Sequence, residues 1–400
     1  MNILIKKGRM KGTVVAPPSK SLAHRRLIAT ALSERGIVEN ISLSDDIVAT
    51  ISCLKELGTN IKMGKNNIEI VSRHITKGDK QFNANESGST LRFLIPIALS
   101  MYDHFTFKGS PKLIERGIGE YERLFRYKGI EITKTSDSIT FNGRLRPGTF
   151  NVYGKTSSQF ISGLLFALPL LDGNSVLNVI PPVESSSYID LTLQVLKEHN
   201  VSVLRLDNSF YIKGGQSYLS GLTKYVEGDY SNASVFLAFN KLGSKVTVNG
   251  LNKYSLQGDK MADEYLEELK KGYQTIDLEN TIDLGPVLMV YAALNHGGRF
   301  IHTERLKYKE SDRALSIKEE LAKVGVEVEV LKDEVRVASS ITPNDEVVFD
   351  SHNDHRIAMA LSLLSSLMDV RILDASCIRK SFPNFFKELG RLGLEVSEYE

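Results

Sequence analysis

Residues 17–25 read PPSKSLAHR and lie between a strand-like run, residues 12–16, and an apolar helical pattern that starts at Leu27. A helix N-terminus presents unpaired N–H groups and a partial positive charge, and both favour a bound anion. Lys20 and Arg25 add two full positive charges at this end. The stretch predicts either an oxyanion site for phosphate or carboxylate, or an ordinary serine N-cap beside two solvated cations.

This strand, small polar turn and apolar helix recur along the chain. The six helix starts are Ser21, Ser89, Ser158, Ser231, Gly285 and Asp354, which are 68, 69, 73, 54 and 69 residues apart. A second helix in each repeat ends at Gly or Asn, the residues that best tolerate the left-handed conformation closing a helix. These stops are residues 58, 129, 200, 272, 325 and 393.

Two short alternating strands are expected after each stop, so that each repeat reads strand–helix–strand–helix–hairpin. The last helix of the fifth repeat is expected over residues 311–324. Six such units predict an α/β protein of two domains with three repeats each, divided near residues 224–229. Because each first helix begins with small or polar residues, several helix ends could converge on one cleft for a small, multiply charged anion.

Composition excludes several other classes of protein. The chain has 400 residues, 42% of them apolar and 24% charged, and a net charge of +2, which gives no case for nucleic-acid or membrane-surface binding. No apolar run reaches the ~18 residues of a membrane span. Cys53 and Cys377 lack metal-ligand spacing, and Cys53 fits a helical core position. We expect a cytoplasmic monomer without metal or cofactor.

Basic residues occupy comparable places in the repeats: Lys20, Arg25, Arg92, Arg116, Lys309, Arg313, Arg356 and Lys380. Each alone fits a capped helix or a solvated ion pair. Asp283 lies among apolar residues at a helix start, where it could be an N-cap or a partly desolvated base. No GxxxxGK[ST] phosphate loop is present. Together these residues predict small phosphorylated and carboxylated substrates without a nucleotide.

Hydroxyl-rich turns begin two further helices. Ser157, Ser158 and Gln159 begin the third repeat's first helix, and Ser185 lies in a similar turn. Hydroxyl and amide groups can donate to phosphate oxygens while they cap a helix. Plain N-capping explains the same residues.

The most specific motifs resemble the 5-enolpyruvylshikimate-3-phosphate synthase family. They are Pro18-Ser19-Lys20-Ser21 with Arg25, Gly88 with Arg92, Ser157-Ser158-Gln159, Lys309-Glu310-Ser311-Asp312-Arg313, Asn353-Asp354-His355-Arg356 and Lys380-Ser381-Phe382-Pro383. The resemblance covers essentially the whole chain. It implies a two-domain inside-out α/β barrel, each domain with three βαβαββ repeats around a pseudo-threefold axis. The implied domains are residues 19–227 and residues 1–18 with 228–400, with the active site in the cleft between them.

The resemblance also implies a reaction and the residues for it. The enolpyruvyl group of phosphoenolpyruvate moves to the 5-hydroxyl of shikimate 3-phosphate through a tetrahedral intermediate, and phosphate leaves. Asp283, Glu310 and Lys20 would be catalytic. Shikimate 3-phosphate would be held by Lys20, Ser21, Arg25, Ser157, Ser158, Gln159, Ser185, Asp283 and Lys309. Phosphoenolpyruvate would be held by Lys20, Gly88, Arg116, Gln159, Arg313, Arg356 and Lys380.

The chain departs from the family pattern in places. Glu86, Ser87 and Ser89 replace common residues around Gly88, and the added charge of Glu86 could weaken binding of an anion or of the inhibitor glyphosate. Because Gly88 is present, glyphosate sensitivity is expected. Arg305 stands where an asparagine often contacts the shikimate phosphate.

Two alternatives remain. A UDP-N-acetylglucosamine enolpyruvyl transferase would share the architecture, but it typically has Lys-Asn at Lys20-Ser21 and a cysteine near Arg116. A non-catalytic anion-binding protein would be expected to have lost Asp283 or Glu310, and both are present.

Overall fold

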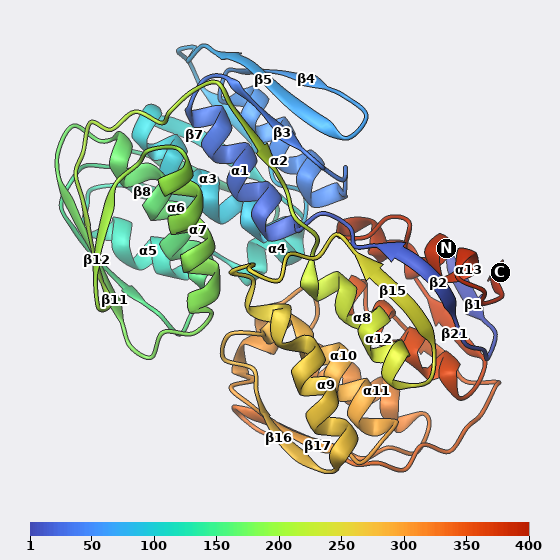
Figure 1. Ribbon diagram of the computed structural model, residues 1–400. Helices are drawn as coiled ribbons and strands as arrows, with labels where there is room; N and C mark the ends of the chain where they lie inside the picture. Colours follow the sequence, from blue (N-terminus) through green and yellow to red (C-terminus); the bar gives the residue numbers. More distant parts are fainter. Residues whose placement is uncertain (400) are drawn as a thin grey trace. The chain divides into compact units, whose positions relative to one another are not determined.

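Two units make up the chain, and the computed structural model describes residues 1–399. Residues 18–227 form one unit, and residues 1–17 form the other together with the chain from residue 228 onward. Each unit contains its own cluster of buried apolar side chains. In Figure 1 the second unit contains the yellow-to-red elements and the dark blue strands at the N-terminus.

The 18–227 unit contains three four-stranded sheets. Their orders are β14-β3-β5-β4, β6-β7-β9-β8 and β10-β11-β13-β12. The strands are β3 (Gly36–Glu39), β4 (Thr59–Met63), β5 (Asn67–Arg73), β6 (Lys80–Asn83), β7 (His104–Lys108), β8 (Glu131–Lys134), β9 (Ser138–Asn142), β10 (Thr149–Tyr153), β11 (Ser175–Ile180), β12 (Val203–Leu206), β13 (Ser209–Ile212) and β14 (Leu222–Tyr225). In every sheet the first two strands are parallel and the last two form an antiparallel hairpin.

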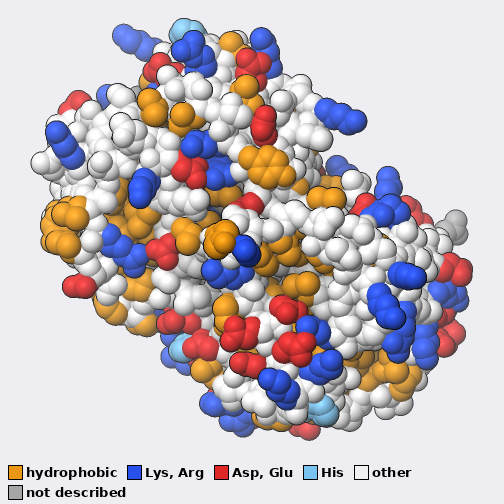
Figure 2. All heavy atoms as spheres, in the orientation of Figure 1, with side chains coloured by type: hydrophobic (Ala, Val, Ile, Leu, Met, Phe, Trp, Pro, Cys, Tyr) orange, Lys and Arg blue, Asp and Glu red, His pale blue; other side chains and the backbone are white. Residues whose placement is uncertain are grey.

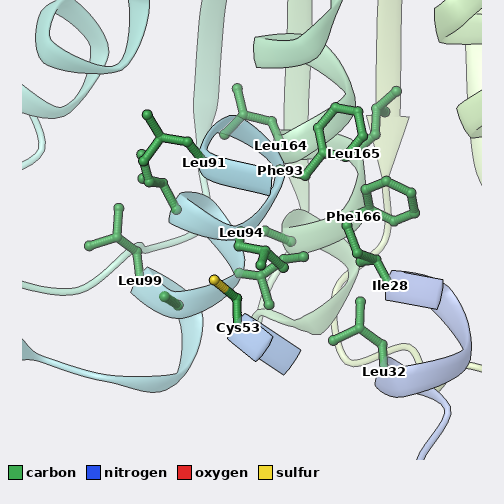
Figure 3. Packing of buried hydrophobic residues seen from close by; sticks show 14 of the residues in the cluster. Ile28, Leu32, Cys53, Leu91, Phe93, Leu94, Leu99, Leu164, Leu165 and Phe166 are labelled. Atoms are coloured by element: carbon green, nitrogen blue, oxygen red, sulfur yellow. The ribbon is translucent and has the colours of Figure 1, made fainter. Parts of the chain in front are cut away.

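Helices form the interior of this unit. They are α1 (Lys20–Leu32), α2 (Asp45–Glu56), α3 (Gly88–Met101), α4 (Pro111–Arg116), α5 (Gly119–Arg126), α6 (Ser158–Ala167), the 3-10 helix η1 (Leu168–Leu170) and α7 (Ser186–Glu198). In α6, nine of ten residues are buried, as expected for a helix that is apolar on all sides. Figure 3 shows side chains of α1, α3 and α6, among them Ile28, Leu94 and Leu165, packed together. Strands such as β11 alternate buried and part-buried residues and so cover the helices with one face.

The other unit follows a similar plan, but one of its sheets has two strands and another includes a strand from the start of the chain. Its strands are β1 (Asn2–Ile5), β2 (Lys11–Val15), β15 (Lys245–Asn249), β16 (Gln274–Asp277), β17 (Gly298–Ile301), β18 (Val328–Val330), β19 (Glu334–Val337), β20 (Val348–Asp350), β21 (Val370–Leu373) and β22 (Val396–Tyr399). Its sheets have the orders β16-β17-β19-β18, β20-β21-β1-β22 and β15-β2. The N-terminal strands therefore complete two of its three sheets.

Helices again fill the interior. They are α8 (Tyr230–Lys241), η2 (Gly258–Met261), α9 (Ala262–Lys271), η3 (Ile282–Leu284), α10 (Gly285–Ala293), η4 (Glu304–Tyr308), α11 (Arg313–Ala322), α12 (His355–Leu361), η5 (Ser362–Ser366), η6 (Ala375–Lys380) and α13 (Phe385–Arg391). All nine residues of α10 are buried. Within residues 1–399, no helix is long and apolar enough to cross a membrane.

The predicted α/β class and the six repeats are confirmed. The first helices of the repeats begin within one residue of the six predicted starts. Five of the six predicted stops are glycines with positive φ, and the sixth, Asn200, has φ 59°. The helix predicted over 311–324 is α11, which is shorter by two residues at each end.

The prediction of a hairpin after every stop is wrong in the fourth and sixth repeats. Within the described residues, Gly393 is followed by the single strand β22, which pairs with β1 from the start of the chain. Gly272 is followed by the single strand β16, which pairs with β17 of the next repeat. The sheet of the fourth repeat has two strands, β15 and β2. The missing hairpin explains why stops 272 and 325 are only 53 residues apart, whereas the other intervals are 68 to 72 residues.

Candidate active site

Residues 17–25, where the sequence predicts an oxyanion site or a plain N-cap, contain the N-cap and the first turn of α1. The Ser19 hydroxyl caps the helix by accepting from the Leu22 N–H at 3.5 Å. Lys20 does not extend as a solvated cation, because its Nζ lies 2.9 Å from Asp46 Oδ2 on α2. Both groups are largely buried, with 16% and 12% of their side chains exposed. The pair fixes the Lys20 ammonium group at the N-terminus of α1.

Arg25 is a buried cation held by neutral groups. Its guanidinium donates to Thr192 Oγ1 at 2.8 Å, to the Tyr188 carbonyl at 3.0 Å and to Ser162 Oγ at 3.3 Å. It also donates to the carbonyl of Ser21. In the part of the chain that the structure describes, Arg25 has no carboxylate partner. Burial lowers the pKa of Arg25 to about 10. A buried cation without a counter-charge is a site for an external anion.

Gly88 begins α3 in the middle of a second polar cluster. A Cβ at Gly88 would lie 3.4 Å from both Arg116 Nη2 and Arg92 Nη1, and 3.5 Å from Gln159 Oε1. Arg92 Nη1 donates to Gln159 Oε1 at 2.7 Å, and Gln159 Nε2 donates to Ser89 Oγ at 3.0 Å. The glycine thus keeps the buried start of α3 free of a side chain beside two guanidinium groups and an amide.

Two further helix starts in this unit carry the predicted hydroxyls. Ser157 caps α6 by accepting from the Gln159 N–H at 3.3 Å. Ser158 is buried. Ser185 precedes α7 in the left-handed region, with φ 58°, and its side chain makes no cap hydrogen bond. Because Arg25 bonds to Tyr188 and Thr192 on α7, the starts of α1 and α7 are linked directly.

The other unit contains a buried network of carboxylates around Arg313. Arg313 is 1% exposed. It donates to Asp283 Oδ1 at 2.6 Å, to Glu310 Oε2 at 2.9 Å and to Asp354 Oδ2 at 2.8 Å. Lys309 Nζ adds a bond of 3.0 Å to the same Asp283 oxygen. Lys309 does not share a helix with Arg313, because η4 ends before Lys309 and α11 begins at Arg313. Asp283 nonetheless brings the two cations together.

The charges set the protonation states in this network. Burial disfavours the ionised form of Asp283, but the charges of Lys309, Arg313 and Arg356 outweigh burial and hold its pKa well below the ordinary value. Burial lowers the pKa of Lys309. Burial also opposes the charge of Arg313, yet Asp354, Glu310 and Asp283 raise its pKa. Asp283 is therefore an ionised carboxylate whose two cation contacts position it.

Arg356 and Lys380 are held near the start of α12. Arg356 Nη1 donates to Asn232 Oδ1 at 3.0 Å, and Nη2 lies 4.0 Å from Asp229 Oδ1. Lys380 Nζ donates to the Asn353 carbonyl at 2.6 Å. Arg305 donates to the Glu279 carbonyl at 2.7 Å.

Sequence reasoning missed the partners that position these side chains. Asp354 bonds Arg313 and caps α12 by accepting from the Arg356 N–H at 2.8 Å, and the repeat pattern did place it at a helix start. Asp259 carried no such signal. It is 3% exposed and accepts from Ser231 Oγ. Burial and the charge of Asp283 raise its pKa to about 7. The unit therefore contains an ionised carboxylate, Asp283, beside another, Asp259, whose pKa lies near neutral pH. Among residues 1–399, no cluster of His, Cys, Asp and Glu could hold a metal ion.

The fold and these clusters define a class of protein: an enzyme for small anionic substrates built from two sets of three α/β repeats. The chain belongs to the EPSP synthase family. The family described as EPSP synthase (3-phosphoshikimate 1-carboxyvinyltransferase) matches residues 4–389.

Curated relatives and a solved structure agree with this family. A 3-phosphoshikimate 1-carboxyvinyltransferase of Clostridium perfringens is 38% identical over 98% of both chains. One of Brachyspira hyodysenteriae is 36% identical over 99% of this chain and 100% of its own. The solved EPSP synthase of Acinetobacter baumannii has the same fold, with a TM-score of 0.79 at 21% identity over 99% of this chain and 100% of its own.

Proposed function

We propose that this protein is a 3-phosphoshikimate 1-carboxyvinyltransferase. It transfers the enolpyruvyl group of phosphoenolpyruvate to the 5-hydroxyl of shikimate 3-phosphate and releases phosphate, a step of aromatic amino-acid biosynthesis. The observation that carries the proposal is that a chain of this family has both a buried cation held by neutral groups, Arg25, and a part-buried ionised carboxylate, Asp283. Both substrates are anions, and the reaction needs a proton acceptor.

In this proposal the 18–227 unit binds most of the substrate charge. Shikimate 3-phosphate is held by Lys20, Ser21, Arg25, Ser157, Ser158, Gln159 and Ser185, with Asp283 and Lys309 from the other unit. Phosphoenolpyruvate is held by Lys20, Gly88, Arg116, Gln159, Arg313, Arg356 and Lys380. The two sets come together in a cleft that closes when the substrates bind, and closure excludes water.

The chemistry is addition followed by elimination. Glu310 protonates the methylene carbon of phosphoenolpyruvate, which leaves a cationic carbon. The 5-hydroxyl oxygen attacks that carbon while Asp283 accepts the hydroxyl proton, giving a tetrahedral intermediate. Glu310 then takes one proton back from the new methyl group, and phosphate departs with the proton that Asp283 had accepted. These steps restore the double bond and both carboxyl groups. The cations that contact Asp283 keep it ionised, and therefore able to accept a proton, across the ordinary pH range.

The test is phosphate release from phosphoenolpyruvate by the purified protein. We expect release that depends on shikimate 3-phosphate and is absent with UDP-N-acetylglucosamine. Turnover with the UDP-sugar alone would assign the sister activity, and binding of both substrates without turnover would indicate an anion-binding protein. We further propose that the protein acts as a cytoplasmic monomer and that glyphosate competes with phosphoenolpyruvate despite Glu86.

A further inference from the structure

Four buried side chains form a hydrogen-bonded chain through the 18–227 unit. His24 Nδ1 lies 2.7 Å from Thr50 Oγ1, Thr50 Oγ1 lies 2.7 Å from Thr90 Oγ1, and Thr90 Oγ1 lies 2.7 Å from Ser87 Oγ. Each of the four is at most 1% exposed. The chain links α1, α2 and the start of α3, and thus crosses from the first repeat to the second. We call it the relay.

The relay has a preferred direction. His24 Nε2 is buried and has no hydrogen-bond partner among the described residues. A buried N–H without an acceptor costs more than a buried lone pair on an under-used acceptor, so the proton belongs on Nδ1. Nδ1–H then donates to Thr50, Thr50 to Thr90, and Thr90 to Ser87. Burial and the charges of Lys20 and Arg25 keep this imidazole neutral by lowering its pKa well below the ordinary value.

The far end of the relay is the cap of α3. Ser87 Oγ accepts from the Thr90 N–H at 3.2 Å, so Ser87 receives both the relay and the cap bond. The next residue is Gly88, whose Cα faces Arg92, Arg116 and Gln159. A shift of the Ser87 hydroxyl would move the first turn of α3 and hence the backbone of Gly88. Helix starts tolerate such shifts unless a side chain anchors them.

We propose that Thr50 is a positioning residue for the phosphoenolpyruvate subsite, because it holds the Ser87–Gly88 turn of α3 in register with α1 through the relay. Thr50 lies on α2, and its hydroxyl contacts His24 and Thr90, neither of which is assigned to substrate. This inference rests on the proposed function, since it takes Gly88, Arg116 and Gln159 as part of that subsite.

The substitution Thr50→Val tests the relay because valine keeps the shape of threonine and removes its hydroxyl. The variant loses the two buried hydrogen bonds of the Thr50 hydroxyl, to His24 and to Thr90. This loss predicts a KM for phosphoenolpyruvate at least about five-fold higher, with a KM for shikimate 3-phosphate within two-fold of wild type. Thr50→Ser restores the hydroxyl and should restore the KM. Thr30→Val is the matched control: Thr30 is also buried and bonds to a histidine, His199, at 3.4 Å, but it lies outside the relay.

A second readout does not require turnover. Hydrogen exchange of the peptide covering residues 85–92 should be faster in Thr50→Val than in wild type, Thr50→Ser and Thr30→Val. Unchanged exchange and KM in Thr50→Val, or equal effects of Thr50→Val and Thr30→Val on both KM values, would overturn the inference. If Thr50→Val does not fold, Ser87→Ala removes the relay at its other end. A wild-type protein without turnover but with the expected exchange pattern would contradict the proposed function and leave the positioning of the turn supported.

Discussion

Arg25 illustrates how single residues prepare the site for charge. Its four hydrogen-bond contacts orient the guanidinium but supply no negative charge. The ring of Phe93 lies 5.0 Å from it and further excludes water. An isolated buried cation is costly to the folded protein, and an incoming phosphate removes that cost. In the proposed function, Arg25 serves binding at the expense of stability.

Replacement of Arg25 should separate these two effects. Arg25→Met should raise the KM for shikimate 3-phosphate by about ten-fold or more, because a charged hydrogen bond is lost. Its melting temperature should equal or exceed that of wild type, since an unpaired buried charge is removed. Steady-state kinetics and a thermal melt measure both, and the exposed Arg35→Met is the control. A lower melting temperature with an unchanged KM would assign Arg25 a purely structural role.

In the proposed mechanism, proton transfer from the 5-hydroxyl depends on Asp283. Asp283→Asn preserves the shape and removes the acceptor, so kcat should fall by about a hundred-fold or more, the usual contribution of a general base. Substrate affinity, measured by calorimetry, should remain within a few-fold of wild type. The exposed Asp277→Asn in the same unit should leave kcat unchanged. A normal kcat in Asp283→Asn would remove this residue from the mechanism.

At this scale the sequence predicted the charged residues better than their partners. Lys20 and Arg313 are recognisable from motifs, whereas Asp46 and Asp259 become visible only when helices distant in sequence pack together. Ser19 is an N-cap, as the second interpretation of residues 17–25 expects, but Lys20 is part-buried against Asp46 and Arg25 is buried, so neither cation is solvated. Motif spacing could not decide this, since burial depends on the surrounding helices. The oxyanion site stays a prediction.

At the scale of elements, the approach of α3 and α6 positions Arg92 and Gln159. The Tyr121 hydroxyl donates to the Arg92 carbonyl at 2.7 Å and to the Phe160 carbonyl at 3.1 Å, and so joins the two helices. Gly163 on α6 makes this approach possible. A Cβ there would lie 2.3 Å from the Tyr121 hydroxyl and 2.4 Å from the Arg92 carbonyl oxygen.

Gly163→Ala should therefore destabilise the protein despite better helix propensity. Propensity favours alanine by about 1 kcal/mol, but overpacking of a tight core contact costs about 1 to 3 kcal/mol, and here backbone must also move. We expect net destabilisation in chemical denaturation. Gly119→Ala is the control, because a Cβ there meets no atom within 4 Å. Equal stability of the two variants would mean that α3 and α6 can separate without cost.

The sequence predicted the elements well because their boundaries depend on local chemistry. Serine, aspartate and glycine at helix ends impose caps and left-handed turns wherever they occur. The hairpin wrongly expected after Gly272 shows the limit. β16 pairs with β17, and the partner of β15 is β2, which comes from the other end of the chain. Which strands pair depends on the strand edges that remain free.

At the scale of the whole molecule, the chain is two units with separate cores and separate titrating groups. Figure 2 shows basic and acidic side chains interspersed over the face in view. One histidine from each unit shows a contrast, because His24 is buried and His352 is part-buried with 24% of its side chain exposed. His24 in one is neutral, whereas His352 in the other bonds Glu320 Oε1 at 2.8 Å, and that bond raises its pKa. The units should therefore respond differently to pH.

His352→Gln tests this response. A histidine with a raised pKa stabilises the fold fully below its unfolded pKa of about 6.5, and the stabilisation is lost as pH rises through the folded pKa. The melting temperature of His352→Gln should lie below wild type by a few degrees at pH 6, and the difference should shrink by pH 8.5. Melts across this range, with the exposed His104→Gln as control, measure it. A difference that grows with pH would contradict the assigned charge state.

The central claim is that the two sets of residues act on one pair of substrates. The most direct measurement is mass spectrometry of the product formed by purified protein from phosphoenolpyruvate and shikimate 3-phosphate. We predict one product with the mass of the two substrates less phosphoric acid, formed one-to-one with released phosphate by wild type and far more slowly by Arg25→Met and Asp283→Asn. Phosphate release without this product, or full activity in either variant, would contradict the account.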